Sequence, residues 1–290
     1  MNKSLQLRII TAVILMLGLI AVTTLLSPFA FALVLAAIVL MASWEWSGLI
    51  GLQDKNSRVR YQITVLIMIG SGFLLLGVTP EADAIDGLRA SMLLLLGLLW
   101  WMVAIVMLTG YPENAGQWND KSKIGLMGIL ALIPTWVGVV MLKYLAPEGY
   151  LVISLVLMVA AVDVGAYFAG TYLGHNKLAP QLSPNKSWEG VWGGLITCLV
   201  LGIAMIIALH VNVVTLSLSQ VIILVLLCPL VTLFAVIGDL VESMLKRNSQ
   251  VKDSGQLLPG HGGVLDRVDA LIAVTPIYVL TILLTLFEVE

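Results

Sequence analysis

Runs of about twenty apolar residues recur along the whole chain, and this feature restricts the fold more than any other. Nine such runs begin close to Leu5, Pro28, Tyr61, Ala90, Ile124, Tyr150, Trp188, Ser219 and Leu265. At about 1.5 Å of helical rise per residue, each run can cross the ~30 Å hydrocarbon core of a bilayer. A segment in lipid has to satisfy its own backbone hydrogen bonds, and a helix does so. We therefore expect an all-α integral membrane protein with about nine transmembrane helices.

Composition supports this class, since 60% of the residues are hydrophobic and 11% are charged, far from the balance of soluble proteins. The first run follows Lys3 and Arg8 as a signal peptide would. It is long, however, lacks a small-x-small cleavage site and leads directly into the second run. We expect it to be retained and to form a tight helical hairpin with the second run.

Lysine and arginine residues gather on one side of the predicted helices. With the N-terminus inside, the inner side holds Lys3, Arg8, Lys55, Arg58, Arg60, Lys121, Lys123, Lys177, Lys186, Lys246, Arg247, Lys252 and Arg267. The outer side holds Arg89 and Lys143. The positive-inside rule therefore predicts a cytoplasmic N-terminus and, with nine spans, a C-terminus outside.

The cysteines and histidines do not indicate a metal or redox site. Cys198 and Cys228 lie inside apolar runs, where small core residues are expected, and the histidines have no zinc-site spacing.

Polar residues that hydrophobicity does not explain occur in three stretches near the predicted inner surface. In the first, AAVDVGAYFAG, Asp163 lies about ten residues, or about 15 Å, from the inner end of the sixth helix. A carboxylate at that depth costs at least ~2.5 kcal/mol and needs a partner or a water-filled cavity. A single hydrogen bond that clamps two helices is the alternative to a functional role.

The second stretch, LSPNKSWEG, precedes the seventh helix. Ser187 is a candidate N-cap, with Glu189 in the first turn. Capping leaves Lys186 unexplained, and a lysine ahead of a helix N-terminus is a candidate phosphate contact. A surface lysine that obeys the positive-inside rule is an equally good explanation.

The third stretch runs from Gly238 to Asp269 and is the densest in charge. Its polar residues on the eighth helix share one face at i, i+3, i+4 and i+7, and they are Asp239, Glu242, Ser243 and Lys246. Carboxylates grouped this closely repel one another unless a cation lies between them, and hard oxygen ligands suit Mg²⁺. The glycines of PGHGG allow the backbone to approach phosphate oxygens. Together these residues predict a nucleotide-phosphate site.

The segment SMLKRNSQVKDSGQLLPGHGGVLDRVD, residues 243–269, resembles the signature of the phosphatidate cytidylyltransferase (CDP-diacylglycerol synthase) family. The stretches DVGAYFAG and SPNKSWEG are similar to two further motifs of that family, in the same order. The resemblance implies the transfer of CMP from CTP to phosphatidate, which releases pyrophosphate, at the inner leaflet of a bacterial inner membrane. It also implies Mg²⁺, together with a second cation such as K⁺.

On the matching positions we expect three sets of site residues. The expected catalytic residues are Asp239, Lys246, Arg247, Lys252, Asp253, His261, Asp266 and Arg267. The expected substrate-binding residues are Asp163, Tyr167, Ser183, Asn185, Lys186, Ser243, Gly260, Gly262 and Gly263. The expected metal ligands are Asp239, Asp266 and Asp269. For His261, a loop histidine satisfied by the backbone is an equally good explanation.

One polytopic domain, residues 1–290, is expected. Within it, residues 1–123 would be structural helices with candidate homodimer contacts, and residues 150–290 would carry the catalytic helices and cytoplasmic loops. The expected partners are CTP, phosphatidate and membrane lipid, with no nucleic acid. An ion-coupled secondary transporter is the main alternative, although the chain has no visible internal repeat and only Asp163 lies deep. A CDP-alcohol phosphotransferase is a third candidate, but the DGxxAR pattern of those enzymes is absent.

Overall fold

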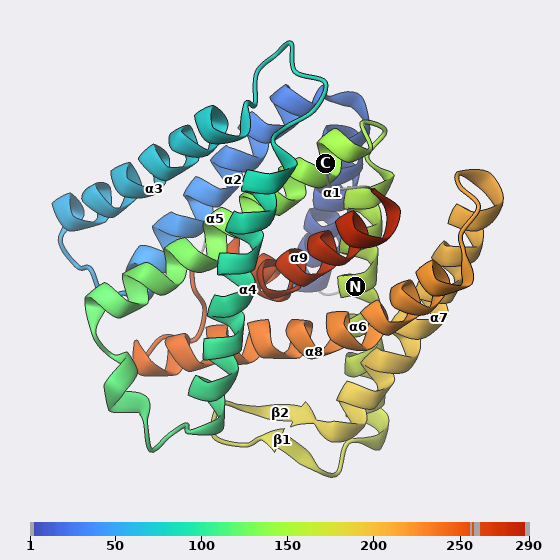
Figure 1. The fold of residues 1–290 in the computed structure, drawn as a ribbon. Coiled ribbons are helices and arrows are strands. Elements are labelled where there is room, and N and C mark those ends of the chain that lie inside the picture. Colours follow the sequence, from blue (N-terminus) through green and yellow to red (C-terminus); the bar gives the residue numbers. More distant parts are fainter. Residues whose placement is uncertain (1–2, 256, 258–261, 288–290) are drawn as a thin grey trace.

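The computed structural model describes residues 3–255, 257 and 262–287, and this part of the chain is built from long helices (Figure 1). The helices are α1 (Lys3–Leu25), α2 (Pro28–Leu49), α3 (Lys55–Leu76), α4 (Gly87–Thr109), α5 (Lys121–Leu145), α6 (Tyr150–Leu173), α7 (Trp188–Asn212), α8 (Leu218–Asn248) and α9 (Leu265–Leu286). A 3-10 helix, η1 (Ala115–Trp118), precedes α5. The eight helices α2 to α9 are long and apolar enough to span a membrane, and α1 contains a shorter apolar segment, Val13–Leu25. The helical membrane architecture is therefore confirmed with eight candidate spans in the described residues, whereas a ninth span at α1 stays a prediction.

Six helices begin after a serine or aspartate that caps them. The side-chain oxygen of each cap accepts a hydrogen bond from the backbone N–H three residues further on, which satisfies one of the free donors of a helix N-terminus. The caps are Ser27, Asp54, Asp86, Asp120, Ser187 and Ser217. The predicted cap of the seventh helix at Ser187 is therefore confirmed. Only Leu26 and Ser27 separate α1 from α2, as a short helical hairpin requires.

The helices α5 and α9 are the most buried of the candidate spans. Gly97 of α4 lets that helix approach both of them, because a Cβ at Gly97 would lie 2.6 Å from Pro134 and 3.3 Å from Pro276. Two indole hydrogen bonds also join α2 to α5. Trp46 donates to the Ile124 carbonyl (2.9 Å), and Trp136 donates to the Ala32 carbonyl (3.2 Å). The N-terminal helices are thus packed directly on the centre of the molecule.

The pair α6 and α7 packs at very short range. A Cβ at Gly165 would lie 2.5 Å from the Gly193 carbonyl oxygen, and Thr197 donates to the Ala161 carbonyl at 2.7 Å. Glycine at the contact between α6 and α7 is what allows these two backbones to come together.

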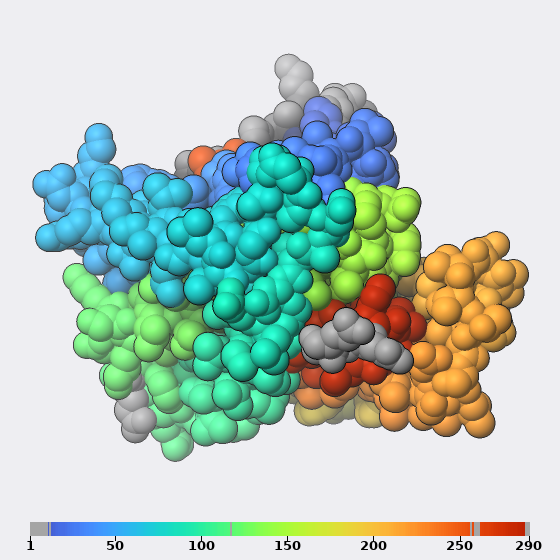
Figure 2. Space-filling model, turned by 45° about the horizontal axis from the view of Figure 1, so that its top comes forward, coloured from blue at the N-terminus to red at the C-terminus, as the bar shows by residue number. Residues whose placement is uncertain are grey.

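Figure 2 shows how the ends of the helices are arranged. The orange end of α7 and α8 stands to one side, and the red end of α9 lies between this orange end and the N-terminal helices.

A β-hairpin connects α6 to α7 and is the one departure from an all-α fold in the described residues. Its strands are β1 (Lys177–Ala179) and β2 (Ser183–Ser187), which pair antiparallel with Lys177 opposite Ser187. The hairpin lies along α8 (Figure 1). Hydropathy predicts a loop between the sixth and seventh helices, because strands of three and five residues are too short to show an apolar alternation.

Candidate active site

The hairpin brings the second polar stretch to the third. Lys186, on β2, extends to α8, where its Nζ lies 2.5 Å from Oδ2 of Asp239. Oδ1 of the same aspartate accepts a hydrogen bond from Ser243, one turn further along α8, at 3.3 Å. The side chains of Lys186 and Asp239 are 22% and 39% exposed, so the contact lies at the edge of the protein interior. Lys186, whose presence helix capping does not explain, therefore has a carboxylate partner in Asp239.

Acidic residues from two further helices, α6 and α9, interact electrostatically with this ion pair. Asp239 of α8 repels Asp163 of α6 electrostatically, and it also repels Asp269 of α9. Lys186 attracts both of those carboxylates, and Arg267 attracts Asp163. The first, second and third polar stretches thus meet in one cluster. Carboxylates outnumber ammonium groups at its centre.

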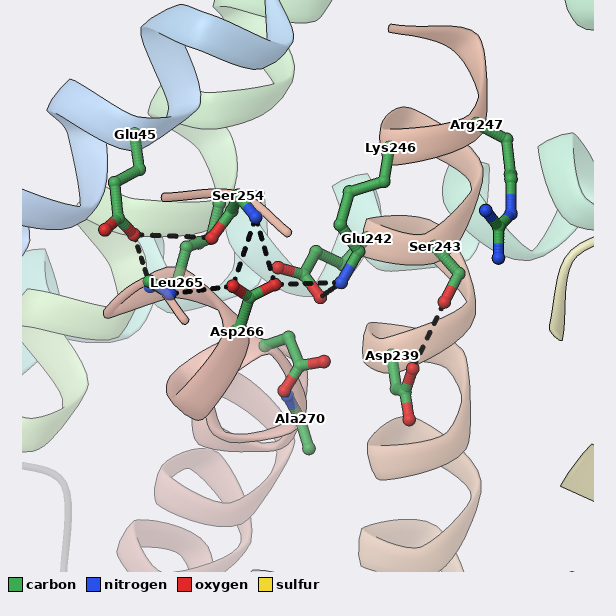
Figure 3. A network of polar contacts seen from close by, with 12 residues as sticks. Glu45, Asp239, Glu242, Ser243, Lys246, Arg247, Ser254, Leu265, Asp266 and Ala270 are labelled. Carbon is green, nitrogen blue, oxygen red and sulfur yellow. Dashed lines mark hydrogen bonds and ion pairs between the residues drawn. The ribbon is translucent and has the colours of Figure 1, made fainter. Parts of the chain in front are cut away.

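A second group of charges is centred on Asp266, at the start of α9 (Figure 3). Lys246 lies 2.9 Å from Asp266 and 2.6 Å from Glu242, so one ammonium bridges α8 and α9. Asp266 also accepts backbone hydrogen bonds from Gly263 (2.8 Å) and Ser254 (3.1 and 3.2 Å). Its side chain is only 7% exposed. These contacts neutralise Asp266 and hold it in one orientation.

The expected face of four polar residues on α8 therefore divides between two directions. Asp239 and Ser243 turn to the hairpin, whereas Glu242 and Lys246 turn to α9 (Figure 3). Residues at i and i+3 on a helix differ by about 60° in direction, which is enough to give them different neighbours.

Glu45 of α2 is a buried acid that is not among the site residues expected from the sequence. It is 3% exposed and accepts hydrogen bonds from the backbone of Val264 and Leu265, at 3.0 and 2.8 Å. Ser254 Oγ lies 3.4 Å from the same carboxylate. An acid between two tryptophans inside an apolar run, in the sequence SWEWS, was the available signal.

The remaining expected residues occupy several environments. Arg247 donates to the Leu182 carbonyl at 3.4 Å, which joins α8 to the hairpin. Gly262 has a φ of 81°, a left-handed conformation that favours glycine, and a Cβ there would lie 2.8 Å from the Asp266 carboxylate. The exposed members of the set are Tyr167, Asn185, Lys252, Asp253 and Arg267, and Ser183 is half-buried. Gly260 and His261 lie outside the described residues.

Charge and donor chemistry at the cluster suit a hard divalent cation. Carboxylates are the protein ligands that Mg²⁺ prefers, and Asp163, Asp239 and Asp269 share one neutralising lysine. Oε1 of Glu242 is buried and has no hydrogen-bond partner among the residues that the structure describes. A small hollow beside it is lined by Glu242 and Asp269 together with apolar residues of α2, α4, α8 and α9. An additional cation near Asp239 and Asp269 would offset the repulsion between them, so the chemistry of these donors fits the ion.

The three expected metal ligands are not assembled as a ready cage. Among the residues that the structure describes, no group of three or more His, Cys, Asp or Glu side chains is arranged to hold a metal ion. Asp266 is held by Lys246 and by backbone N–H groups, whereas Asp239 is held by Lys186. The two aspartates thus belong to different groups of contacts. Asp239 and Asp269, whose carboxylates repel each other, form the stronger candidate pair of ligands.

A separate hollow of about 390 Å³ lies between α6, α7, α8 and α9 in the other half of the molecule. Its lining is mainly apolar, and its polar groups include Tyr150 and a hydrogen-bonded pair, Ser154 and Tyr278, at 2.7 Å. Tyr150 begins α6, whereas Asp163 lies about 20 Å further along that helix. The hollow lies toward one end of these helices and the acidic cluster toward the other.

Comparison with known proteins places the chain in a family. The profile of the cytidylyltransferase family matches residues 6–285, which is almost the whole chain. The chain belongs to the cytidylyltransferase family. A phosphatidate cytidylyltransferase of Pseudomonas aeruginosa is 40% identical to it over 271 residues, covering 93% of this chain and 94% of the relative. One of Haemophilus influenzae is 37% identical over 284 residues, covering 93% and 96%.

A protein with the same name from Bacillus subtilis matches over a shorter stretch. It is 44% identical over 128 residues, which cover 44% of this chain and 45% of the relative. The full-length similarity to the first two proteins includes the helices that precede the signature. Membership therefore rests on the whole chain and not on the signature alone.

Proposed function

We propose that this protein is a phosphatidate cytidylyltransferase, which converts CTP and phosphatidate into CDP-diacylglycerol and pyrophosphate. The observation that carries the proposal is the convergence of Asp163, Asp239, Asp269 and Lys186, from three helices and a hairpin, at one end of a membrane-spanning bundle. The names of the full-length relatives support the same reaction. The transporter alternative has no comparable support, because the matching family is one of cytidylyltransferases.

The reaction joins one phosphate to another. An oxygen of the phosphatidate phosphate attacks the α-phosphorus of CTP, a new P–O bond forms, and the bond between the α-phosphorus and the bridging oxygen of pyrophosphate breaks. Pyrophosphate leaves with the electron pair. The attacking phosphate is already anionic, so no strong general base is required. Alignment and neutralisation of charge supply most of the catalysis in reactions of this kind.

Cationic side chains of the chain would align the phosphates. Lys186 is positioned by the hairpin, Lys246 by its two carboxylate contacts, and Arg247 by the Leu182 carbonyl. Lys252 and Arg267 are exposed at the same end of the helices. These five residues can contact the triphosphate and the phosphatidate headgroup from several directions, which restricts both to an in-line arrangement.

The acidic residues would hold Mg²⁺. Asp239 and Asp269 are the proposed ligands, and Asp163 assists from α6, whereas Asp266 maintains Lys246 and the start of α9 in place. When bound, the ion would neutralise the developing charge on the phosphates. A second cation such as K⁺ is part of this proposal.

Depth in the membrane agrees with a lipid substrate. Asp163 lies ten residues from the end of α6, or about 15 Å along the helix. A headgroup that enters sideways between helices could reach such a carboxylate while its acyl chains remain in lipid.

The proposed location is a bacterial inner membrane, with the site facing the cytoplasm and the N-terminus inside, in accord with the positive-inside rule. A homodimer that uses helices within residues 1–123 is also proposed.

The purified protein in detergent, incubated with labelled CTP and phosphatidate, tests the function. Lipid-soluble label should appear only when Mg²⁺ is present, and pyrophosphate should appear in equal amount. Reconstituted vesicles provide the comparison, since an ion-coupled transporter would dissipate a gradient. Gradient dissipation without any labelled lipid would refute the enzyme.

A further inference from the structure

Glu45 lies in the N-terminal half of the chain, yet its carboxylate is embedded in the C-terminal signature. It is placed near the end of α2, beside Trp46, whose indole fastens that helix to α5. The side chain is 3% exposed. Burying a carboxylate is costly unless strong donors surround it, so the position requires specific partners.

The partners of Glu45 are the first donors of α9. Val264 N–H donates to Oε1 at 3.0 Å, and Leu265 N–H donates to Oε2 at 2.8 Å. No side-chain hydrogen bond from Val264, the residue at the cap position, closes this helix end. An anion at a helix N-terminus is stabilised by the free N–H groups and by the helix dipole. Glu45 therefore caps α9 from a helix more than two hundred residues away in the sequence.

The loop before α9 is shaped around this carboxylate. A Cβ at Gly263 would lie 2.5 Å from Oε2 of Glu45, and a Cβ at Gly255 would collide with Oε1. Only glycine leaves room for the acid at these two positions. Gly255 and Gly263 of the signature thus have a packing role toward α2, in addition to any contact with phosphate.

Glu45 and Asp266 bind the same short segments of chain. Ser254 donates from its hydroxyl to Glu45 and from its backbone to Asp266. Gly263 donates to Asp266, and the next two residues donate to Glu45 (Figure 3). A shift of the Glu45 carboxylate would displace the donors of Asp266, and with them the ion pair to Lys246.

We infer that Glu45 is a positioning residue for nucleotidyl transfer: from α2 it holds the start of α9 and Ser254, so that Asp266 and Lys246 keep their orientation in the active site. This inference rests on the proposed function for its kinetic consequences but not for its structural ones. The inference gives α2 a role in positioning active-site residues, in addition to its role in structural support.

Kinetics of Glu45→Gln provide the first test. The amide nitrogen would face a backbone N–H, so one of the two helix-capping bonds is lost and α9 shifts. We expect kcat to fall by at least about tenfold with the KM for CTP unchanged within about twofold, because alignment and not ground-state binding is damaged. Glu45→Asp keeps the charge with a shorter reach, and its kcat should lie between those of Glu45→Gln and the wild type.

Trp136→Phe is the matched control, since it removes the hydrogen bond from α5 to the Ala32 carbonyl of α2, lies outside the proposed site and leaves the α9 contacts intact. It should lower the thermal midpoint by a similar amount as Glu45→Gln but preserve kcat. If both variants lose kcat in the same proportion to their loss of thermal stability, Glu45 is only a structural residue and the inference fails.

Limited trypsin digestion of the full chain in detergent gives a readout that needs no catalysis. Lys252 is exposed two residues before Ser254, which Glu45 holds. Cleavage after Lys252 should be faster in Glu45→Gln than in wild type, and unchanged in Trp136→Phe. Unchanged cleavage in Glu45→Gln would overturn the inference even if the protein proved inactive with CTP and phosphatidate, so the two proposals can fail separately.

Discussion

Lys186 on the β-hairpin and Asp239 on α8 are in direct contact, with 2.5 Å between Nζ and Oδ2. The contact closes the hairpin onto a helix that begins thirty-one residues after β2 ends. It also places one ammonium beside a carboxylate, Asp239, that repels both Asp163 and Asp269, and Lys186 attracts those two acids as well. The hairpin thus supplies the charge that lets the acids of different helices remain together.

Replacing this lysine should disable the site without unfolding the protein. In Lys186→Met the three carboxylates lose their shared cation and the phosphates lose a contact, so turnover should fall by roughly 100-fold. Lys177→Met, an exposed position on the neighbouring strand, is the matched control and should leave turnover near normal. Initial rates with saturating CTP measure the effect. Equal rates for the two variants would show that Lys186 is an ordinary surface lysine.

Asp266→Asn should abolish most turnover while the protein stays inserted and helical. The substitution removes the charge that pairs with Lys246, and it leaves that ammonium with Glu242 alone. We expect a loss of roughly 100-fold or more in rate, measured together with circular dichroism and detergent gel filtration. Asp86→Asn, at the N-cap of α4, is the control, because asparagine caps a helix as well as aspartate does. Near-normal turnover of Asp266→Asn would remove this residue from the site.

The dependence of turnover on Mg²⁺ concentration should change when Asp269 is replaced. Chelation of divalent ions should stop turnover of the wild-type protein, and Mg²⁺ should restore it. In Asp269→Asn one proposed oxygen ligand loses its charge, so the Mg²⁺ concentration for half-maximal rate should rise by about tenfold or more. Asp120→Asn, at the N-cap of α5, keeps its cap and should show the wild-type Mg²⁺ curve. Identical curves for the two variants would count against Asp269 as a ligand.

The close packing of α6 on α7 can be tested at a single glycine. Gly165→Ala would place a Cβ 2.5 Å from the Gly193 carbonyl oxygen, so the helices must separate. Overpacking of this kind costs about 1–3 kcal/mol, which should appear as a lower thermal midpoint. Turnover should fall as well, because α6 carries Asp163 and α7 follows the hairpin. Gly70→Ala on α3, where a Cβ meets nothing within 4 Å, should be neutral or stabilising.

The proposed orientation predicts which loops are accessible from each side. A cysteine introduced at Lys177 should react with a membrane-impermeant thiol reagent only after the cells are permeabilised. A cysteine at Glu81, in the connection from α3 to α4, should react in intact cells. The native Cys198 and Cys228 are buried, so the background should be low. The opposite labelling pattern would invert the topology and remove the cytoplasmic site.

Much of the architecture could be predicted because bilayer thickness limits the length of a spanning helix. The predicted start at Pro28 coincides with the first residue of α2, and those at Tyr150, Trp188 and Leu265 are also first residues. The larger differences are at Tyr61, where α3 begins six residues earlier, at Lys55, and at Ala90 and Ile124, where α4 and α5 begin three residues earlier, at Gly87 and Lys121. In all three cases the helix extends beyond its apolar run to an aspartate cap, so a hydropathy pattern alone places the start too late.

The candidate site was predictable as a set of residue types and less so as a set of contacts. Asp239, Asp266 and Asp269 were expected as metal ligands, and that assignment stays a prediction. The structure pairs Asp239 with Lys186 and Asp266 with Lys246. Spacing along α8 indicates which side chains share a helix face, but it does not identify the neighbour that each one meets. The role of Glu45 was not predictable for the same reason, since its partners lie more than two hundred residues away.

The sequence by itself determined the class of protein, the approximate limits of the helices and the side on which charged residues gather, because these properties follow from local hydrophobicity and helical periodicity. Tertiary structure alone decided which acid meets which base. Those pairings depend on how α2, α8, α9 and the hairpin pack, and hydrophobic packing between distant segments leaves no pattern in a single stretch of sequence. The carboxylate of Glu45 at the start of α9 is the clearest case, because its energy depends on donors that only the folded chain brings within 3 Å.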